Sequence, residues 1–168
     1  DIISGGLGRD NLVGLAGNDT IYGEIINGNG PDDIDRIDAG DGNDVVWGNA
    51  GNDIISGGAG HDTIHGGKGD DRISGEDGND KIYGDAGDDN ISGDLGNDLI
   101  FGGIGTDFVH WSNGDGNDTV DGQDGADKLL VKAGIGNLID TFRVSKSTLA
   151  GVDTEVSYIN PIAVTTLL

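Results

Sequence analysis

Seven consecutive segments of nine residues, beginning at residue 48, repeat one arrangement of glycine, aspartate and an aliphatic residue. They read GNAGNDIIS, GGAGHDTIH, GGKGDDRIS, GEDGNDKIY, GDAGDDNIS, GDLGNDLIF and GGIGTDFVH. A fixed period predicts a solenoid, in which each repeat packs only against its neighbours and cannot bury its apolar residue alone. The pattern therefore favours a stack of short elements over a domain with one central core.

The aspartate at position six marks the frame of the repeat. It recurs in every nonapeptide from Asp44 to Asp107 without interruption. An insertion at residues 24–34 shifts the frame, and two extra residues at 111–112 shift it again. We expect a bulge or loop at the insertion. The in-frame aspartates are Asp1, Asp10, Asp19, Asp35, Asp44, Asp53, Asp62, Asp71, Asp80, Asp89, Asp98, Asp107, Asp118 and Asp127.

Position eight is aliphatic in every repeat. An apolar centre between two polar neighbours predicts a three-residue strand that points only its centre inward. These residues are the candidate core, and a file of them along the chain predicts an all-β fold. They are Ile3, Leu12, Ile21, Ile37, Val46, Ile55, Ile64, Ile73, Ile82, Ile91, Ile100, Val109, Val120 and Leu129.

Position four is glycine in every repeat except one, which has Asp33. Glycine permits the positive φ angles that allow turn carbonyls to converge, and the aspartate adds an anionic oxygen. Carbonyl and carboxylate oxygens are the ligands that calcium prefers, whereas zinc prefers nitrogen and sulfur. The turns are therefore candidate calcium sites.

These units resemble GGxGxDxUx, where U is a large aliphatic residue, the repeat of the RTX (repeats-in-toxin, hemolysin-type) calcium-binding proteins. The resemblance covers residues 1–130. It implies a right-handed parallel β-roll, a β-solenoid in which two nonapeptides form one turn and calcium lies between stacked turns. Every second nonapeptide then lies on the same edge, so that Asp44 stacks on Asp62 and Asp62 on Asp80.

The resemblance also implies the ligands. Each ion takes one aspartate from each of two stacked turns, together with backbone carbonyls, and we expect about eight to ten ions. The candidate carboxylates are Asp10, Asp19, Asp35, Asp44, Asp53, Asp62, Asp71, Asp80, Asp89, Asp98, Asp107, Asp118 and Asp127. The candidate carbonyls belong to Gly48, Gly51, Gly57, Gly60, Gly66, Gly69, Gly75, Gly78, Gly84, Gly87, Gly93, Gly96, Gly102 and Gly105.

The irregular segments predict departures from this scheme. Sites near Asp19 and Asp35 should be weakened by the insertion, where Asp32, Asp33 and Asp38 could offer substitute ligands. The slip at 111–112 lengthens the spans from Asp98 to Asp118 and from Asp107 to Asp127, which makes the sites there less regular. After residue 130 the pattern stops, and strand-like runs such as TFRVS, TEVSYI and AVTTLL predict that residues 131–168 form a short β-rich cap or tail.

The charge points to cations as partners. Thirty-one acidic residues oppose nine basic ones, for a net charge of −22, which disfavours nucleic acid and anionic membrane surfaces. No stretch is apolar enough to span a bilayer, and there is no cysteine. One aliphatic residue per repeat offsets little of the entropy lost in ordering so many glycines, so we expect folding to require calcium. The resemblance implies type I secretion and a secreted, extracellular or cell-surface location.

Two other functions stay open. Trp47, His65, Tyr83 and Phe101 recur at position nine on one face, opposite Ser56, Ser74 and Ser92. These rings predict one of two things. Either they stack on one another across strands, on a face that is free or covered, or they form a surface for adhesion or carbohydrate binding.

The other alternative is the non-catalytic tail of an RTX protease, lipase, toxin or epimerase, whose catalytic domain would lie upstream. The chain contains no nucleophile motif, so we expect no catalysis of its own. His61 and His65 in HDTIH resemble the paired ligands of a zinc protease, but on a strand they lie too far apart to share a zinc. We expect Asp62 to be a calcium ligand and the histidines to be bystanders.

Overall fold

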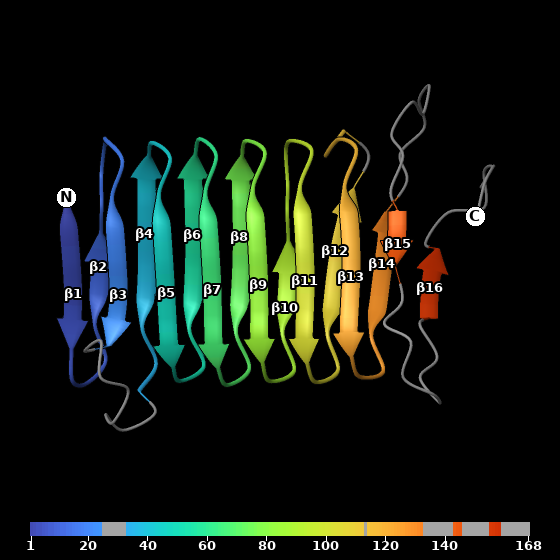
Figure 1. Cartoon of the computed structure of the whole chain (residues 1–168), viewed down its shortest axis with the longest axis horizontal. Coiled ribbons are helices and arrows are strands. Elements are labelled where there is room, and N and C mark those ends of the chain that lie inside the picture. The colour runs from blue at the N-terminus through green and yellow to red at the C-terminus, as the bar shows by residue number, and fades with distance from the viewer. Residues whose placement is uncertain (25–32, 113, 133–142, 146–154, 159–168) are drawn as a thin grey trace.

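The computed structural model describes residues 1–24, 33–112, 114–132, 143–145 and 155–158 (Figure 1). Within these ranges all regular elements are β-strands, and no helix is present that could cross a bilayer. The strands are β1 Ile2–Gly6, β2 Asn11–Val13, β3 Thr20–Glu24, β4 Arg36–Asp41, β5 Val45–Ala50, β6 Ile54–Ala59, β7 Thr63–Lys68, β8 Arg72–Asp77, β9 Lys81–Ala86, β10 Asn90–Ser92, β11 Leu99–Ile104, β12 Phe108–Ser112, β13 Thr119–Asp124, β14 Lys128–Lys132, β15 Arg143–Ser145 and β16 Glu155–Tyr158.

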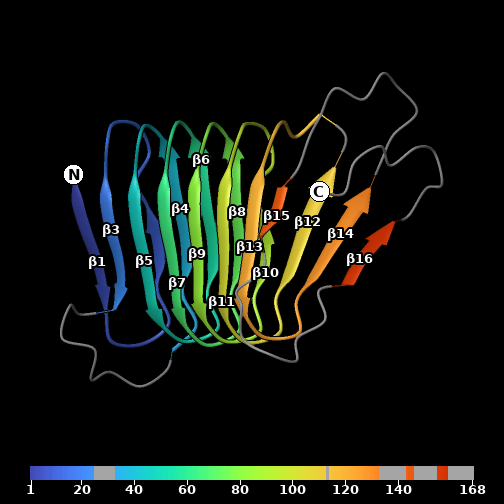
Figure 2. The ribbon, with the colours of Figure 1, turned by 45° about the vertical axis from the view of Figure 1, so that its right-hand side comes forward.

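Consecutive strands alternate between two parallel sheets. The odd-numbered strands form one sheet from β1 to β15, and the even-numbered strands form the other from β2 to β16. Figure 2 shows the two sheets as separate layers joined by turns. Strand β7 pairs with β9 so that Ile64 lies beside Ile82, which places every second nonapeptide in contact. The predicted parallel β-roll with two nonapeptides per turn is thereby confirmed.

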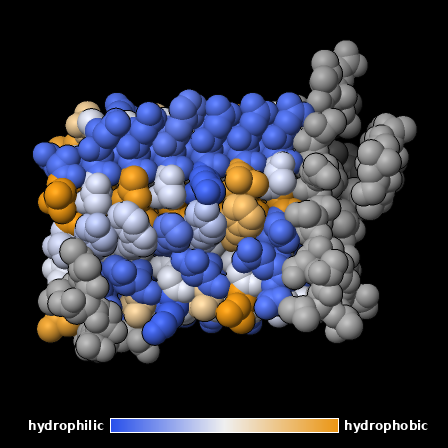
Figure 3. All heavy atoms as spheres, viewed as in Figure 1, coloured by the Kyte–Doolittle hydropathy of each residue, from blue (hydrophilic) through white to orange (hydrophobic). Residues whose placement is uncertain are grey.

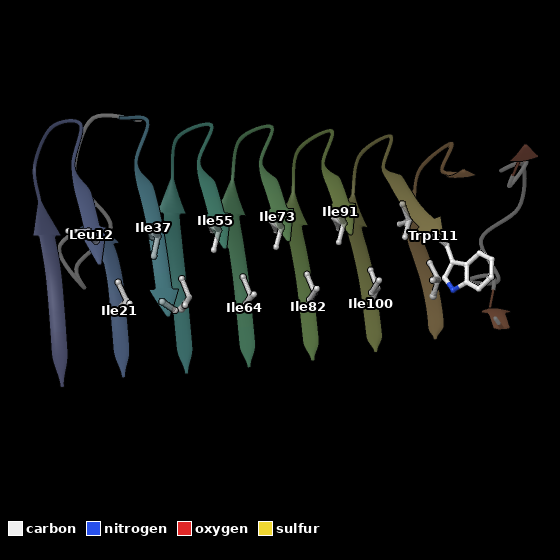
Figure 4. Packing of buried hydrophobic residues seen from close by; sticks show 14 of the residues in the cluster. Leu12, Ile21, Ile37, Ile55, Ile64, Ile73, Ile82, Ile91, Ile100 and Trp111 are labelled. Carbon is white, nitrogen blue, oxygen red and sulfur yellow. The ribbon is translucent and has the colours of Figure 1, made fainter. Parts of the chain in front are cut away.

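The core is a double file of aliphatic side chains between the sheets (Figure 4). Of the fourteen position-eight residues, all are buried except Ile3, which is partly buried against the same cluster. Their neighbours on each strand face outward, as alternation along a strand requires. The core is therefore only one residue wide in each sheet.

Both sheets continue past the insertion. Strand β3 pairs with β5, bringing Ile21 beside Val46, and β2 pairs with β4, bringing Leu12 beside Ile37. These partners lie farther apart in the sequence than two nonapeptides, yet they pair in the regular register, so the insertion does not disturb the pairing of these strands. Residues 25–32, including Pro31 and Asp32, lie outside the described ranges.

The two extra residues at 111–112 form the end of β12 and not a loop. Trp111 pairs with Val131 of β14, and its side chain is buried in the core cluster. The slip thus adds an aromatic residue to the core near the end of the regular repeats.

Two C-terminal strands extend the sheets. Strand β15 pairs with β13, placing Val144 beside Val120, and β16 pairs with β14, placing Val156 beside Leu129. Two of the predicted strand runs therefore contain strands, whereas AVTTLL lies outside the described residues. That residues 131–168 act as a cap remains a prediction.

Candidate metal sites along the two turn edges

Every repeat aspartate lies in a turn, directly before the next strand, so the aspartates form two rows along opposite edges of the roll. The turns that lead into the odd-numbered strands form the upper edge in Figure 1, which is hydrophilic along its length in Figure 3. We call this row the Asp62 edge, and it contains Asp19, Asp44, Asp62, Asp80, Asp98 and Asp118. The opposite row, the Asp71 edge, contains Asp10, Asp35, Asp53, Asp71, Asp89, Asp107 and Asp127.

The aspartates of each row are joined by one repeated hydrogen bond. The backbone N–H of Asp44 donates to Oδ1 of Asp62 at 2.8 Å, and that of Asp62 donates to Oδ1 of Asp80 at 2.9 Å. The same bond crosses the insertion, from Asp19 to Asp44 at 2.7 Å. It also crosses the slip, from Asp98 to Asp118 at 2.9 Å. The predicted stacking of the aspartates is confirmed, and neither irregularity interrupts it.

The second carboxylate oxygen, Oδ2, has a different environment. In eleven of these aspartates Oδ2 is buried and has no hydrogen-bond partner among the described residues. A buried charged oxygen without a partner is strongly destabilising unless a cation neutralises it. The eleven are Asp10, Asp19, Asp35, Asp44, Asp53, Asp62, Asp71, Asp80, Asp89, Asp98 and Asp107.

A glycine carbonyl from the next turn borders the same space as Oδ2 in eight of these aspartates. A Cβ atom added to Gly57, at position one of the repeat, would lie 2.6 Å from Oδ2 of Asp62 and 2.8 Å from the carbonyl oxygen of Gly75 in the next turn. The same convergence of an aspartate and a stacked carbonyl occurs at Gly48, Gly66, Gly84 and Gly102. Glycine at position one therefore keeps open a space bordered by one carboxylate and one carbonyl oxygen.

The glycines at position four bring the stacked turns together. Gly60 has φ +145°, and the carbonyl of Gly42 in the preceding turn points directly at its Cα, leaving no room for a side chain. In the irregular repeat Asp33 takes this role with its backbone, because its carbonyl approaches Gly51 in the same way. Its side chain accepts a hydrogen bond from the N–H of Gly8 at 2.9 Å.

The other substitute ligands fare differently. Asp38 is exposed in the middle of β4 beside Ser56, so the structure does not place it in a turn, and the prediction that it could replace a ligand is wrong on this geometry. Asp32 lies outside the described residues.

Burial makes these carboxylates difficult to ionise when no cation is present. Burial, and then the charges of Asp53 and Asp89, raise the pKa of Asp71 to about 8. Burial, and then the charge of Asp107, raises the pKa of Asp89 to about 7, and burial, and then the charge of Asp118, raises the pKa of Asp98 to about 7. The pKa of Asp53 is raised to about 6 by burial and by the charges of Asp35 and Glu24. Each edge is thus a row of carboxylates that repel one another, and the one described ion pair with a repeat aspartate joins the Asp1 ammonium to Asp19 at 2.6 Å.

The HDTIH segment does not form a zinc site. His61 lies in the turn, where Nδ1 accepts the N–H of Asn79 at 2.8 Å and its own N–H donates to Oδ1 of Asn43 at 2.8 Å. His65 lies on β7, beside Asp85 at 3.0 Å. His61 is therefore a rung of a hydrogen-bonded ladder of position-five side chains. That the histidines take no part in metal binding stays a prediction.

The aromatic residues at position nine form one continuous stack on the sheet of odd-numbered strands. Ring centroids are 6.0 Å apart between Trp47 and His65, 4.4 Å between His65 and Tyr83, and 5.1 Å between Tyr83 and Phe101. Tyr22 adds a fifth ring, 4.9 Å from Trp47. The planes are within 12° of parallel, so the inner rings present their faces to one another and not to solvent. A sugar ring stacks on an aromatic face, so this geometry favours cross-strand stacking over carbohydrate binding.

The opposite face carries polar contacts. Ser56 donates to Oε1 of Glu76 at 2.6 Å, and Ser92 donates to Oδ1 of Asp94 at 2.7 Å. The bond of Ser92 joins β10 to the turn that follows it, and the bond of Ser56 joins β6 to β8. The serine face is therefore polar.

The donors in the turns fit calcium. Among the residues that the structure describes, no three acidic, histidine or cysteine side chains converge on one point, so a metal would depend on the mixture of carboxylate and carbonyl oxygens found here. Such oxygen-only sets suit calcium.

Comparison with known proteins agrees with this geometry. The family model described as the RTX calcium-binding nonapeptide repeat (4 copies) matches residues 1–25, 29–64, 57–91, 74–109 and 114–138. A search of curated proteins found no match. The nonapeptide period, the parallel β-roll and the family model agree over most of the chain. The chain therefore belongs to the RTX calcium-binding nonapeptide repeat family.

Proposed function

We propose that this chain is a non-catalytic module whose two turn edges hold calcium and whose folding depends on it. The observation that carries the proposal is the set of eleven buried Oδ2 atoms that have no hydrogen-bond partner among the described residues, eight of which lie beside the carbonyl of a stacked glycine. Oδ1 of the same carboxylates already accepts a backbone N–H, so Oδ2 is the oxygen available to an ion.

The dependence on calcium follows from charge and burial. Bound calcium would supply positive charge along both edges, where the one described ion pair with a repeat aspartate is that of the Asp1 ammonium with Asp19. Without it, neighbouring carboxylates such as Asp53 and Asp71 repel one another at low dielectric, and the single-residue core does little to oppose this repulsion. Binding that needs the folded turn adds its free energy to folding.

The number of ions follows from the stacking. Ligands come from the thirteen predicted aspartates and the carbonyls of position-one and position-four glycines, and we propose eight to ten ions per chain. The support is that the backbone ladder of aspartates runs unbroken along both edges. Equilibrium dialysis against radioactive calcium would count them.

The biological role rests on the family. Calcium is scarce inside cells and plentiful outside, so a chain that folds only with calcium could cross a type I secretion channel unfolded and fold on arrival. We propose that the module belongs to a secreted bacterial protein and that any catalysis is performed by another domain. The family membership supports this proposal.

The direct test is circular dichroism of calcium-depleted protein as calcium is added. We expect little strand signal before addition and a cooperative gain at millimolar calcium. Magnesium at the same concentration is the control for ligand chemistry, because it demands a tighter octahedral shell. Sodium chloride at matched ionic strength is the control for screening. An unchanged strand signal, or an equal gain with sodium chloride, would contradict the proposal.

A further inference from the structure

The residue at position one of the repeat differs between the two turn edges. On the Asp71 edge it is glycine before every aspartate, from Gly5 to Gly122. On the Asp62 edge it is glycine in most turns, but two turns carry a side chain there, that of Ala39 and that of Trp111. Two extra residues separate Trp111 from its aspartate, so Ala39 is the exception that precedes a turn of regular length.

Ala39 lies where the neighbouring turn has a glycine. The residues on either side of Ala39 in β4 pair with those on either side of Gly57 in β6, so the two residues occupy the same place in the sheet. Both are buried, and each lies five residues before the aspartate of its turn, Asp44 or Asp62. A Cβ atom on Gly57 would lie 2.6 Å from Oδ2 of Asp62. The register therefore places the methyl group of Ala39 beside the carboxylate of Asp44.

The core is adapted to this methyl group. A Cβ atom on Gly57 would also lie 3.1 Å from Cδ1 of Ile64, the core residue seven positions later, which is tighter than an ordinary contact. The core residue seven positions after Ala39 is Val46, which has no Cδ1 atom. Ala39 and Val46 both belong to the core cluster. The shorter side chain of Val46 thus leaves room for the methyl group.

We propose that Ala39 closes the calcium site between the turns of Asp44 and Asp62, so that the Asp62 edge is interrupted there while the Asp71 edge is not. Calcium needs six to eight oxygen ligands at about 2.3–2.6 Å, and a methyl group beside Oδ2 supplies none and excludes a water molecule. This inference rests on the proposed calcium binding and goes beyond it, because it states which stacked pair of aspartates does not hold an ion.

The test exchanges alanine and glycine at the two aligned positions. Isothermal titration calorimetry of the whole chain with calcium chloride gives the number of ions and their affinities. We expect Ala39→Gly to bind one more ion than the wild type, or to bind one ion at least tenfold more tightly. Ala59→Gly removes a methyl group from an exposed residue of the same edge and should match the wild type. An Ala39→Gly profile equal to that of the wild type would overturn the inference.

The reciprocal variant places the methyl group in the next turn. Gly57→Ala combined with Ile64→Val reproduces the native pair of Ala39 and Val46, so the core can accept the added carbon. We expect this double variant to lose one ion or to bind one ion at least tenfold more weakly, whereas Ile64→Val alone should keep every ion. Full binding by the double variant would contradict the role given to the methyl group.

Locating the ions directly covers the case in which the variants do not fold. Anomalous diffraction from wild-type crystals grown in calcium chloride should show an ion between the turns of Asp62 and Asp80. Between the turns of Asp44 and Asp62 it should show none, or one of lower occupancy, and equal occupancy would overturn the inference. If the wild type binds no calcium at all, the proposed function fails. If it binds calcium and fills the turn of Asp44 like its neighbour, only the role of Ala39 fails.

Discussion

At the scale of the residue, each repeat aspartate divides its carboxylate between two tasks. In Asp71, Oδ1 accepts the N–H of Asp53 at 2.7 Å and thereby joins two turns, while Oδ2 is buried and has no hydrogen-bond partner in the described part of the chain. Asp70, directly before it, is exposed, and its Oδ1 accepts the N–H of Asp88. Two adjacent acids of equal charge therefore have different roles.

The pair gives a matched test of the ligand assignment. Asp71→Asn keeps an oxygen for the backbone bond but replaces the other oxygen with an amide that cannot bind a cation. We expect the calcium concentration at half-folding to rise on the order of tenfold, which corresponds to about 1.4 kcal/mol. Asp70→Asn should change it by less than about twofold, given the small value of exposed charges. Equal effects of the two variants in a calcium titration followed by circular dichroism would argue against the assignment.

The raised pKa values also predict how the metal-free chain responds to acid. Asp71, Asp89 and Asp98 have a higher pKa in the folded roll, about 7 to 8, than the value near 4 of an unfolded chain. Such groups stabilise the fold below pH 4, and their contribution is lost as the pH rises through the folded pKa. After calcium is removed on a chelating resin, strand signal should therefore be greater at pH 5 than at pH 8.

Calcium should remove this dependence, because the bound form needs ionised ligands. The protein saturated with calcium should be fully folded at pH 8. Sedimentation velocity must show a monomer at pH 5, since acidification also reduces the net charge that keeps chains apart. A monomer with equal or smaller strand signal at pH 5 would contradict the pKa argument.

At the scale of the element, a regular strand contributes one core residue at position eight and one outward residue at position nine. From β3 to β11 the position-nine residues of the sheet of odd-numbered strands are rings, and Trp47 stacks between Tyr22 and His65. Pairing in strict register places identical repeat positions in contact, so a ladder forms from whatever residue occupies the position.

The ladder predicts that Trp47→Ala lowers stability. Each stacked pair contributes about 0.5–1.5 kcal/mol beyond the area buried, so losing two pairs should lower the free energy of unfolding by roughly 1–3 kcal/mol. Urea denaturation in saturating calcium would measure this. Ser56→Ala, at position nine on the other sheet, is the control and should change stability by less than about 1 kcal/mol. A stable Trp47→Ala that loses binding to a glycan would instead favour the ligand surface.

The sequence predicts the regular elements well and the irregular ones poorly, for a physical reason. Strict nonapeptide spacing determines strand, core and turn together, so the pairing of Asp62 with Asp80 could be read directly. Tyr22 was missed as a rung because the insertion moves it out of the regular spacing from Trp47. Assigning Oδ1 and Oδ2 needed the backbone geometry of stacked turns.

At the scale of the whole molecule, the roll is one-dimensional. Each pair of repeats contacts only the pairs before and after it, so stability is a sum of terms between neighbours. The hydrogen-bonded aspartates make those terms strong, because every carboxylate in the middle of an edge lies between two others.

This arrangement predicts cooperative binding. An ion that orders one turn also fixes the aspartate that borders the next site. The next ion therefore binds a site that is already partly ordered, and its binding costs less conformational entropy. Strand signal plotted against free calcium should be sigmoidal, with a Hill coefficient well above one. Substituting two neighbouring aspartates of one edge, Asp62→Asn with Asp80→Asn, should divide the transition or lower its steepness. The control is Asp70→Asn with Asp88→Asn, two exposed neighbours that should leave the steepness unchanged. A hyperbolic curve for the wild type would show that the turns bind calcium independently, despite the ladder that joins them.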